Sequence, residues 1–166
     1  FDQNLIYFYL MKALVKKKAE KGLWMEEVPI PMVDTNEVLI RIQKTAICGT
    51  DFHIYEWNEW ARRTISPPIV IGHEFVGVVE KVGIGVTHYK EGDIVSGEGH
   101  ITCGYCRNRR AGKRHLCHRT IGVGIHRDGA FAEFLVIPEQ NVWPVHPDIP
   151  LEVASCFDPY GNAVHT

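Results

Sequence analysis

Two short runs of the sequence place metal-ligating side chains beside a glycine. Cys48 precedes Gly49, and Gly72 precedes the pair His73-Glu74. A thiolate, an imidazole and a carboxylate are all ligands of Zn²⁺, and a catalytic zinc site uses three protein ligands and keeps a fourth position open. Neighbouring side chains of an extended chain point to opposite faces, so His73 and Glu74 reach one ion only if the backbone bends. Gly72 permits that bend; without it, Glu74 would orient the ligands from outside.

Each run taken alone also has a structural interpretation. A lone Cys48 is typical of a small buried apolar residue. An isolated pair such as His73-Glu74 is more often a hydrogen-bonded histidine next to a solvated glutamate. The prediction of a metal site therefore depends on how these runs combine with further motifs.

A third run contains Cys103-Gly104-Tyr105-Cys106, and Cys117 follows after ten residues. The chain has five cysteines, an odd number, and no secretory signal precedes them, which favours reduced thiols over a disulfide framework. Clustered reduced cysteines more often bind a metal than form bridges. A redox function for the Cys-x-x-Cys is disfavoured because no βαβ unit surrounds it.

The composition is that of an ordinary globular domain. With 166 residues, of which 45% are apolar, the chain is long enough for one domain with a sizeable core. A formal net charge of −2 gives no basic excess that would indicate nucleic acid, and no apolar run is long enough to span a bilayer. We therefore expect a cytoplasmic protein with a small-molecule substrate and with no nucleic-acid or membrane partner.

The first ten residues are assigned to a leader or to a remnant of cloning. They are apolar and aromatic, they do not begin with Met, and positive charges at Lys12 and Lys16–Lys18 come after them. A signal peptide has its positive charge first. The domain is therefore predicted to cover residues 11–166, beginning at Met11.

Short runs of β-forming residues separated by turns predict a mainly β fold. The expected strands are Val38–Ile42 with an extension, Phe75–Val82, Ile94-Val95, Phe131–Ile137 and Val142–Val145. The last of these is expected at a sheet edge, because Pro144 cannot donate to a ladder. A helical turn or two is expected only within Asp51–Arg62. Many short strands with frequent Gly and Pro between them are typical of a β-barrel or sandwich.

A dinucleotide-binding fingerprint is not found. Such a site requires Gly-x-Gly-x-x-Gly between a strand and a helix. Gly122-x-Gly124 lacks the third glycine and leads into a turn, and Gly83-x-Gly85 has no helix after it. We therefore expect no residue of this chain to bind a nicotinamide cofactor.

Taken in order, the runs resemble the zinc-dependent medium-chain dehydrogenases. The matching motifs are Cys48-Gly49-Thr50-Asp51-x-His53, Gly72-His73-Glu74-x-x-Gly77, Gly92-Asp93-x-Val95 and a cysteine-rich lobe that begins at Cys103. The resemblance covers nearly all of residues 11–166. It implies a GroES-like β-barrel catalytic domain with a few short helices, and a Rossmann domain that is absent from this chain.

Two further runs resemble one subfamily of these dehydrogenases. They are Gly97-Glu98-Gly99-His100 and Asp158-Pro159-x-Gly161-Asn162-Ala163-Val164-His165-Thr166. The resemblance implies oxidation of the L-threonine hydroxyl to give 2-amino-3-oxobutanoate, with NAD as a hydride acceptor bound outside this chain, which alone is expected to be inactive. The alternatives are a dehydrogenase of polyols or other secondary alcohols in the same family, and a zinc-binding module without enzymatic activity.

The resemblance assigns Cys48, His73 and Glu74 to a catalytic zinc, which lowers the pKa of a bound hydroxyl. Thr50 and His53 would relay the released proton, because a histidine can titrate near neutral pH. The alternative is a threonine that caps the turn and a histidine that is merely exposed.

Two more residues have roles implied by the resemblance. Asp158 is expected beside the zinc ligands, where it assists proton transfer; its alternatives are a fourth ligand and a helix or turn cap. His100 is expected to line the substrate pocket and to help to recognise the amino acid, with a place in the core as its alternative.

The resemblance also implies a structural zinc held by four cysteines, but Arg109 stands where the third cysteine of the lobe would be. An arginine stays cationic and cannot ligate. Either His115 or His118 completes a Cys3His site, or the site is weak or empty, or Arg109 is a sequence error or an engineered change. The family further suggests a homo-oligomer, with a tetramer as the expected assembly.

Overall fold

The computed structural model describes residues 9–165 of the chain. Most of the segment assigned to a leader lies outside these residues, but Leu10 is the first residue of strand β1. The strands are β1 (Leu10–Lys16), β2 (Trp24–Pro29), β3 (Glu37–Ala46), β4 (Ile69–Val70), β5 (Glu74–Val82), β6 (Ile94–Gly97), β7 (His100–Ile101), β8 (Ile121–Gly122), β9 (Phe134–Pro138) and β10 (Val142–Pro144). The helices are α1 (Gly49–Glu56), α2 (Glu59–Thr64), α3 (Arg107–Arg110), α4 (Leu151–Ala154) and α5 (Phe157–His165), with 3-10 turns η1 (Arg114–Leu116) and η2 (Glu139–Asn141).

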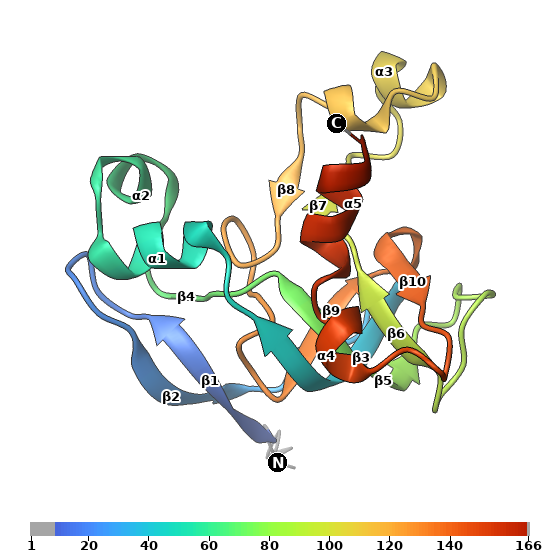
Figure 1. The fold of residues 1–166 in the computed structure, drawn as a ribbon, viewed down its shortest axis with the longest axis horizontal. Coiled ribbons are helices and arrows are strands. Elements are labelled where there is room, and N and C mark those ends of the chain that lie inside the picture. The colour runs from blue at the N-terminus through green and yellow to red at the C-terminus, as the bar shows by residue number, and fades with distance from the viewer. Residues whose placement is uncertain (1–8, 166) are drawn as a thin grey trace, which may run out of the picture.

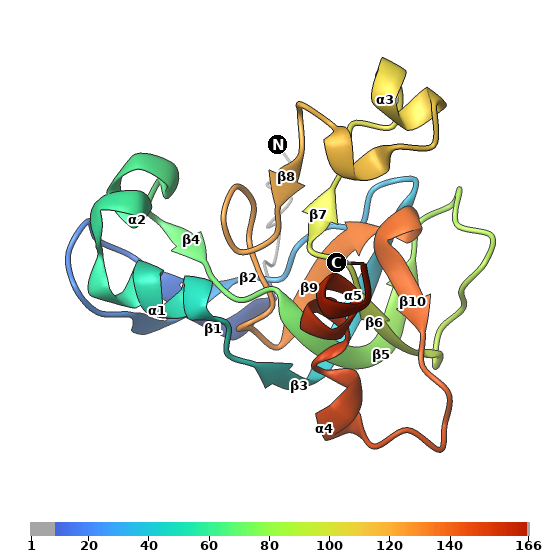
Figure 2. The same ribbon diagram turned by 45° about the horizontal axis from the view of Figure 1, so that its top comes forward.

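Five antiparallel strands form the main sheet, in the order β10-β6-β5-β3-β9 (Figure 1). Register shifts after Leu39 and after Ile42 interrupt the pairing of β3 with β5. Such irregularities increase the twist of a sheet, and this sheet curls into a half-barrel (Figure 2). Alternate side chains of β3, such as Val38 and Ile40, enter the main buried cluster together with Phe75 of β5.

A smaller sheet, β2-β1-β4, adjoins helices α1 and α2 (Figure 1). Ile54 of α1 and Ala61 of α2 pack with Ile69 of β4 and with Ile71 in one buried cluster. This packing fixes the helix that begins directly after Cys48. None of the helices within residues 9–165 is long and apolar enough to cross a bilayer.

The predicted mainly β fold is confirmed, and the strands expected around Val38–Ile42 and Phe75–Val82 are present. The prediction for Phe131–Ile137 begins too early, since β9 starts at Phe134. The backbone of Phe131 is hydrogen-bonded to the smaller sheet instead. Its N–H donates to the carbonyl of Ile71, which follows β4, at 2.9 Å, and its carbonyl accepts from the N–H of Leu14 in β1 at 2.7 Å.

The helical segment expected within Asp51–Arg62 consists of two helices. Trp57, which adopts a left-handed conformation with φ of 54° and ψ of 45°, separates α1 from α2. Strands β1 and β2 and the C-terminal helix α5 are not among the predicted elements. The C-terminal edge strand is present as β10, and Pro144 lies opposite Val95 at the border of the sheet.

Three glycines meet at the bend that precedes β5. Gly72 has a φ of 90° and Gly124 a φ of 72°, conformations that side chains other than glycine rarely adopt. A Cβ atom on Gly124 or Gly129 would collide with the backbone of Gly72. This close backbone contact fixes the chain direction at the point where His73 follows.

Lys16, at the end of β1, is fully buried. Its ammonium group donates to the carbonyl oxygens of Glu20, Gly22 and Tyr55, the last two at 3.0 and 3.5 Å, and lies 4.8 Å from the centre of the Trp57 ring. Burial lowers the pKa of Lys16. The cation therefore joins the loop after β1 to the end of α1.

We expect Lys16→Met to lower the free energy of unfolding by about 1–3 kcal/mol, because three carbonyl groups lose a charged donor. Urea denaturation measures the change. Lys17→Met is the matched control: it removes an exposed ion pair with Glu26 and should change stability by less than about 0.5 kcal/mol. Equal losses in the two variants would contradict the role given to Lys16.

Candidate metal centre

The pairing of β3 with β5 brings Cys48 and the His73-Glu74 pair together. Ala46, the last residue of β3, lies opposite Glu74, the first residue of β5, and Cys48 follows as the N-cap of α1. Gly72 bends the chain immediately before His73. As a result, ligand atoms of Cys48, His73 and Glu74 all lie within 4.8 Å of one another.

This group of side chains fits a zinc ion. One thiolate, one imidazole and one carboxylate are a donor set that leaves a fourth position for a substrate. Nδ1 of His73 is buried without a hydrogen-bond partner among residues 9–165, which is costly unless another group satisfies the nitrogen. Glu74 is only 5% exposed, and a buried carboxylate requires a compensating cation.

Asp51, a motif residue for which the sequence suggests no role, holds one member of this group, Cys48, by hydrogen bonds. Its Oδ2 accepts a hydrogen bond from the Cys48 N–H at 2.9 Å, and its own N–H donates to the Cys48 carbonyl at 3.1 Å. Its second oxygen, Oδ1, is buried and unpaired among the described residues. The carboxyl is 4% exposed, and burial raises its pKa, while the hydrogen bond from the Cys48 N–H opposes this shift. Asp51 therefore holds Cys48 in place and adds negative charge near His73.

Negative charge is concentrated throughout this region. Burial raises the pKa of Glu74, and the neighbouring carboxylates Asp158 and Asp51 raise it further. Burial likewise raises the pKa of Asp158. The metal-free chain thus bears an electrostatic cost that a divalent cation would relieve.

A second group of side chains lies beside the first. Glu98 Oε1 and His100 Nδ1 are 2.6 Å apart, and the N–H of Gly99 donates to Asp158 Oδ1 at 3.2 Å. Ligand atoms of Glu98, His100 and Asp158 lie within 4.8 Å of one another. A Cβ atom on Gly99 would lie 3.3 Å from His73 Cβ and 3.8 Å from Asp158 Oδ1, so Asp158 lies near both groups, and it also raises the pKa of Glu74. The hydrogen bond to Glu98 raises the pKa of His100.

All three side chains of this second group line a cavity of about 840 Å³. His100 is exposed and lines this cavity, and its role in recognising a substrate stays a prediction. Glu98 has no assigned role in the sequence analysis; its position two residues before His100 was the available signal. Asn141 holds the turn between them, because its side-chain amide donates to the carbonyls of Glu98 and His100 at 2.9 and 3.0 Å.

Thr50 and His53 lie three residues apart on α1, on the same side of the helix. The His53 ring is exposed at the surface, and its Nδ1 lies 2.9 Å from the side-chain nitrogen of Asn58. Thr50 is in the first turn, two residues after Cys48. The helix therefore leads from the candidate metal group toward solvent.

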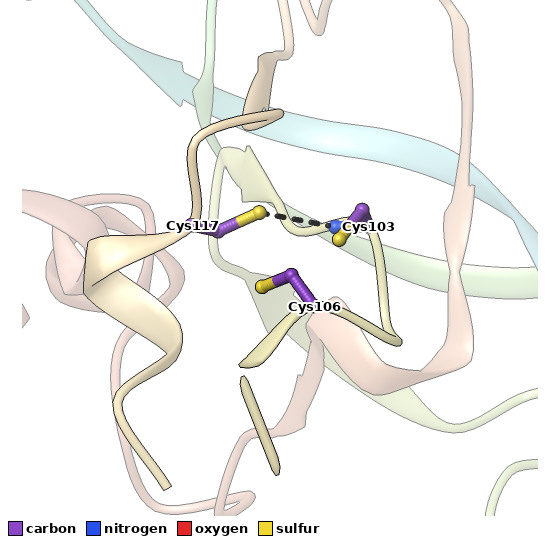
Figure 3. Close-up of side chains that lie close together, drawn as sticks. All are labelled: Cys103, Cys106 and Cys117. Atoms are coloured by element: carbon purple, nitrogen blue, oxygen red, sulfur yellow. Dashed lines mark hydrogen bonds between the residues drawn. The ribbon is translucent and has the colours of Figure 1, made fainter. Parts of the chain in front are cut away.

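The cysteine lobe, residues 103–117, stands apart from the main sheet and contains α3 and η1 (Figure 1). The sulfur atoms of Cys103, Cys106 and Cys117 lie within 4.8 Å of one another and face a common centre (Figure 3). Hydrogen bonds from the backbone N–H groups of Cys103 and Arg119 lower the pKa of Cys117 to about 7. The Cys117 thiol is therefore prepared to act as a thiolate ligand.

Arg109 contributes its backbone N–H, and not a ligand, to this lobe. The N–H lies 3.5 Å from Cys106 Sγ, and the guanidinium donates to Gln140 at 3.2 Å. His115 packs against the ring of His165, and His118 lies 3.4 Å from the Asn108 amide nitrogen. Among the described residues, the group of this lobe that could hold an ion contains the three cysteines and no histidine.

Comparison with known proteins identifies the family. Residues 34–147 match the model of the alcohol dehydrogenase GroES-like domain, which is the catalytic domain of zinc-dependent medium-chain alcohol dehydrogenases. The chain belongs to this family. The expected family and the expected GroES-like fold are thereby confirmed.

Curated relatives are highly similar to this chain in sequence. The chain is 62% identical over 157 residues to the L-threonine 3-dehydrogenase of Mesorhizobium japonicum, and 60% identical over 156 residues to that of Solibacter usitatus. These alignments cover 95% and 94% of the chain but only 46% of each relative. The chain therefore spans less than half the length of the curated relatives it matches.

Solved structures agree on the fold. Galactitol-1-phosphate dehydrogenase of Escherichia coli matches with a TM-score of 0.85 at 29% identity, over 93% of this chain and 44% of that protein. A zinc-binding dehydrogenase of Sinorhizobium meliloti, solved with NADP, matches with a TM-score of 0.84 at 28% identity, over 95% and 44% of the two chains.

The raised pKa of Glu74 leads to a prediction for the metal-free chain. A carboxyl whose pKa is higher in the folded than in the unfolded state destabilises the fold when ionised, and this cost disappears as the pH falls through the folded pKa. We expect Glu74→Gln to stabilise the metal-free chain at pH 7, and to have little effect well below pH 4.5, the ordinary pKa of glutamate.

Urea denaturation in the presence of a chelator measures this effect, and a Zn²⁺ titration of the same variant should show an affinity at least about tenfold weaker. Glu152→Gln is the control, since Glu152 is exposed and Lys44 and a backbone bond lower its pKa. A Glu74→Gln chain that is less stable than wild type at pH 7 would refute this account of the site.

Proposed function

We propose that the protein to which this chain belongs oxidises the hydroxyl of L-threonine to give 2-amino-3-oxobutanoate, with NAD as the hydride acceptor. The observation that carries the proposal is the group Cys48, His73 and Glu74. Asp158, a carboxylate that raises the pKa of Glu74, also lines a cavity of about 840 Å³ together with Glu98. The names of relatives about 60% identical to this chain support the choice of substrate.

In this proposal Cys48, His73 and Glu74 hold the catalytic zinc, and Asp51 fixes Cys48 at the start of α1. When bound, zinc supplies Lewis-acid polarisation of the substrate hydroxyl, which favours its deprotonation. The oxidised carbon loses a hydride to NAD, and the hydroxyl loses a proton. Thr50 takes part in moving this proton toward His53, whose exposed ring exchanges it with water.

The cavity wall supports an amino acid as substrate. An amino acid carries an ammonium and a carboxylate group, whereas a polyol carries neither. Asp158 and the Glu98–His100 pair offer both a negative and a titratable positive group within the same cavity. We assign Asp158 to proton transfer beside the zinc ligands, and His100 to recognition of the amino acid. A polyol or another secondary alcohol remains the alternative substrate class, and a zinc-binding module without enzymatic activity the alternative function.

NAD is proposed as the acceptor, bound by a part of the protein outside this chain. The Sinorhizobium relative was solved with NADP, so both cofactors belong in the activity measurement. This chain alone should be inactive. We also propose a cytoplasmic homo-oligomer, with four subunits as in the resemblance described above; size-exclusion chromatography with light scattering tests that assembly.

Activity of the full-length protein tests the proposal. We expect kcat/KM for L-threonine to exceed that for sorbitol or 2,3-butanediol by at least about 10²-fold, since charged groups that lose their partners discriminate strongly. Cys48→Ser should lower kcat/KM by at least about 10³-fold. His146→Ala, at an exposed site where the ring contacts Asp148, should leave it unchanged. Preference for sorbitol would select the polyol alternative, and no turnover of any alcohol would favour the non-enzymatic one.

The cysteine lobe leads to a separate proposal: Cys103, Cys106 and Cys117 hold a structural zinc less tightly than the catalytic group holds its ion. Three protein ligands gather there among the residues that the structure describes, whereas structural zinc sites almost always have four. Arginine side chains near the lobe, such as Arg119, favour thiolates when no metal is bound.

Metal analysis after stepwise chelation should show that the lobe loses its zinc at a lower chelator concentration than the catalytic group. Arg109→Cys should increase retention there by at least about tenfold, because a fourth thiolate completes the tetrahedron. Arg110→Cys, which places an extra thiol on the neighbouring exposed position, is the matched control. Simultaneous loss of both ions from the wild-type chain, or equal retention in the two variants, would contradict the proposal.

A further inference from the structure

The turn between α1 and α2 returns the chain to His53. Trp57 adopts the left-handed conformation, which is unfavourable for a residue other than glycine. Its ring is 8% exposed and packs in the cluster that joins the two helices, so tertiary packing maintains this conformation. The N–H of Asn58 then lies 3.4 Å from the carbonyl of His53. Asn58 is therefore held beside His53 through its backbone.

The side chain of Asn58 makes two hydrogen bonds, and together they fix its orientation. As the N-cap of α2, its Oδ1 accepts from the Ala61 N–H at 3.0 Å. Because a backbone N–H can only donate, the amide oxygen must face Ala61. The NH2 group must then face His53, where it lies 2.9 Å from Nδ1. An amide NH2 group can only donate, so Nδ1 of His53 accepts and carries no proton.

We propose that Asn58 is a positioning residue for His53, which it holds as the neutral ring protonated on Nε2. A proton that binds to Nδ1 meets the NH2 group and breaks this hydrogen bond. Turning the amide to offer its oxygen to His53 removes the acceptor from Ala61 and uncaps α2. Proton uptake at Nδ1 is therefore coupled to the N-terminus of α2. The consequence for catalysis rests on the relay in the proposed function, but the coupling itself is a property of this chain.

Charged side chains on the two helices have partners other than His53. Asp51 accepts from the Cys48 N–H, Glu56 pairs with Lys21 at 2.7 Å, and Glu59 pairs with Arg63. Arg62 donates to the Trp57 carbonyl at 3.0 Å. The ring of Trp60 is 6.3 Å from that of His53 and carries no charge. Asn58 is thus the polar side chain seen to bond the His53 ring among the described residues.

The test replaces the amide by groups that keep the helix cap. Asn58→Asp supplies one oxygen to Ala61 and a second to His53, so the ring must donate from Nδ1. Asn58→Ser retains a cap but removes the group that faces the ring. We expect ¹⁵N NMR of the histidine side chains in this 166-residue chain to show Nε2–H in wild type, Nδ1–H in Asn58→Asp, and a mixture in Asn58→Ser.

Amide hydrogen exchange of Ala61 supplies the second measurement. In wild type, protonation of His53, followed by NMR, should speed exchange of the Ala61 amide at least about threefold beyond the intrinsic effect of pH, whereas Asn58→Asp should show no such increase. An unchanged tautomer in Asn58→Asp, or Ala61 exchange that ignores the state of His53, would overturn the proposal. If full-length protein fails to oxidise L-threonine while these spectra behave as expected, the proposed function fails and the role of Asn58 stands.

Discussion

Buried negative charge beside one imidazole is the constraint on which the candidate centre depends. Asp51, Glu74 and Asp158 are carboxyl groups whose pKa burial raises, and they surround His73 and Cys48. A fold selected only for stability would replace such groups by apolar ones, since unpaired buried charge is costly. Three features of the backbone hold these carboxyl groups close together. They are the pairing of β3 with β5, the helix that begins after Cys48, and the close contact of Gly124 and Gly129 with Gly72. A divalent cation bound to the group would offset the electrostatic cost of these buried carboxylates.

The two cysteine-containing regions bring their ligand atoms together in different ways. Around Cys48, the ligands come from separate elements of the main sheet, and the sheet itself fixes their distance. In the cysteine lobe, the three sulfurs come from one short segment with little regular structure, and hydrogen bonds from backbone N–H groups orient them. The lobe has few buried apolar residues of its own. The folded conformation of the lobe must therefore depend more on a bound ion than that of the main sheet does. For this reason Arg109, which cannot ligate a metal, should destabilise the lobe more than a non-ligating residue near the sheet would.

Local patterns were sufficient to predict the mainly β fold. Cys48 and the His73-Glu74 pair each fitted a structural role when taken alone, so their assignment to one metal depended on the resemblance of the combined motifs to a family. The bend at Gly72 could be inferred because glycine readily permits it. The start of β9 could not be inferred, because Phe131 has the composition of a strand residue and its true partners, Leu14 and Ile71, are distant in sequence. Asp51 and Glu98 belong to motifs quoted from the sequence, but the spacing of residues gives them no role. Their roles follow from burial and from hydrogen bonds that are known only from the structure. Likewise, nothing local to Trp57 predicts a left-handed conformation in an otherwise helical segment.

That left-handed turn connects the stability of the fold with the proposed chemistry. The Trp57 ring packs under α1 and α2 and receives the Lys16 cation at 4.8 Å, while its backbone directs Asn58 toward His53. In the coupling proposed above, the backbone of Trp57 thereby helps to set which nitrogen of the exposed His53 ring holds a proton. Glycine at this position would adopt the same backbone angles more easily, but it would remove the ring that fixes the two helices relative to each other. Packing of the Trp57 side chain in the cluster between the two helices offsets the cost of the left-handed conformation. In the proposed relay, the same turn places Asn58 beside the histidine that meets the surface.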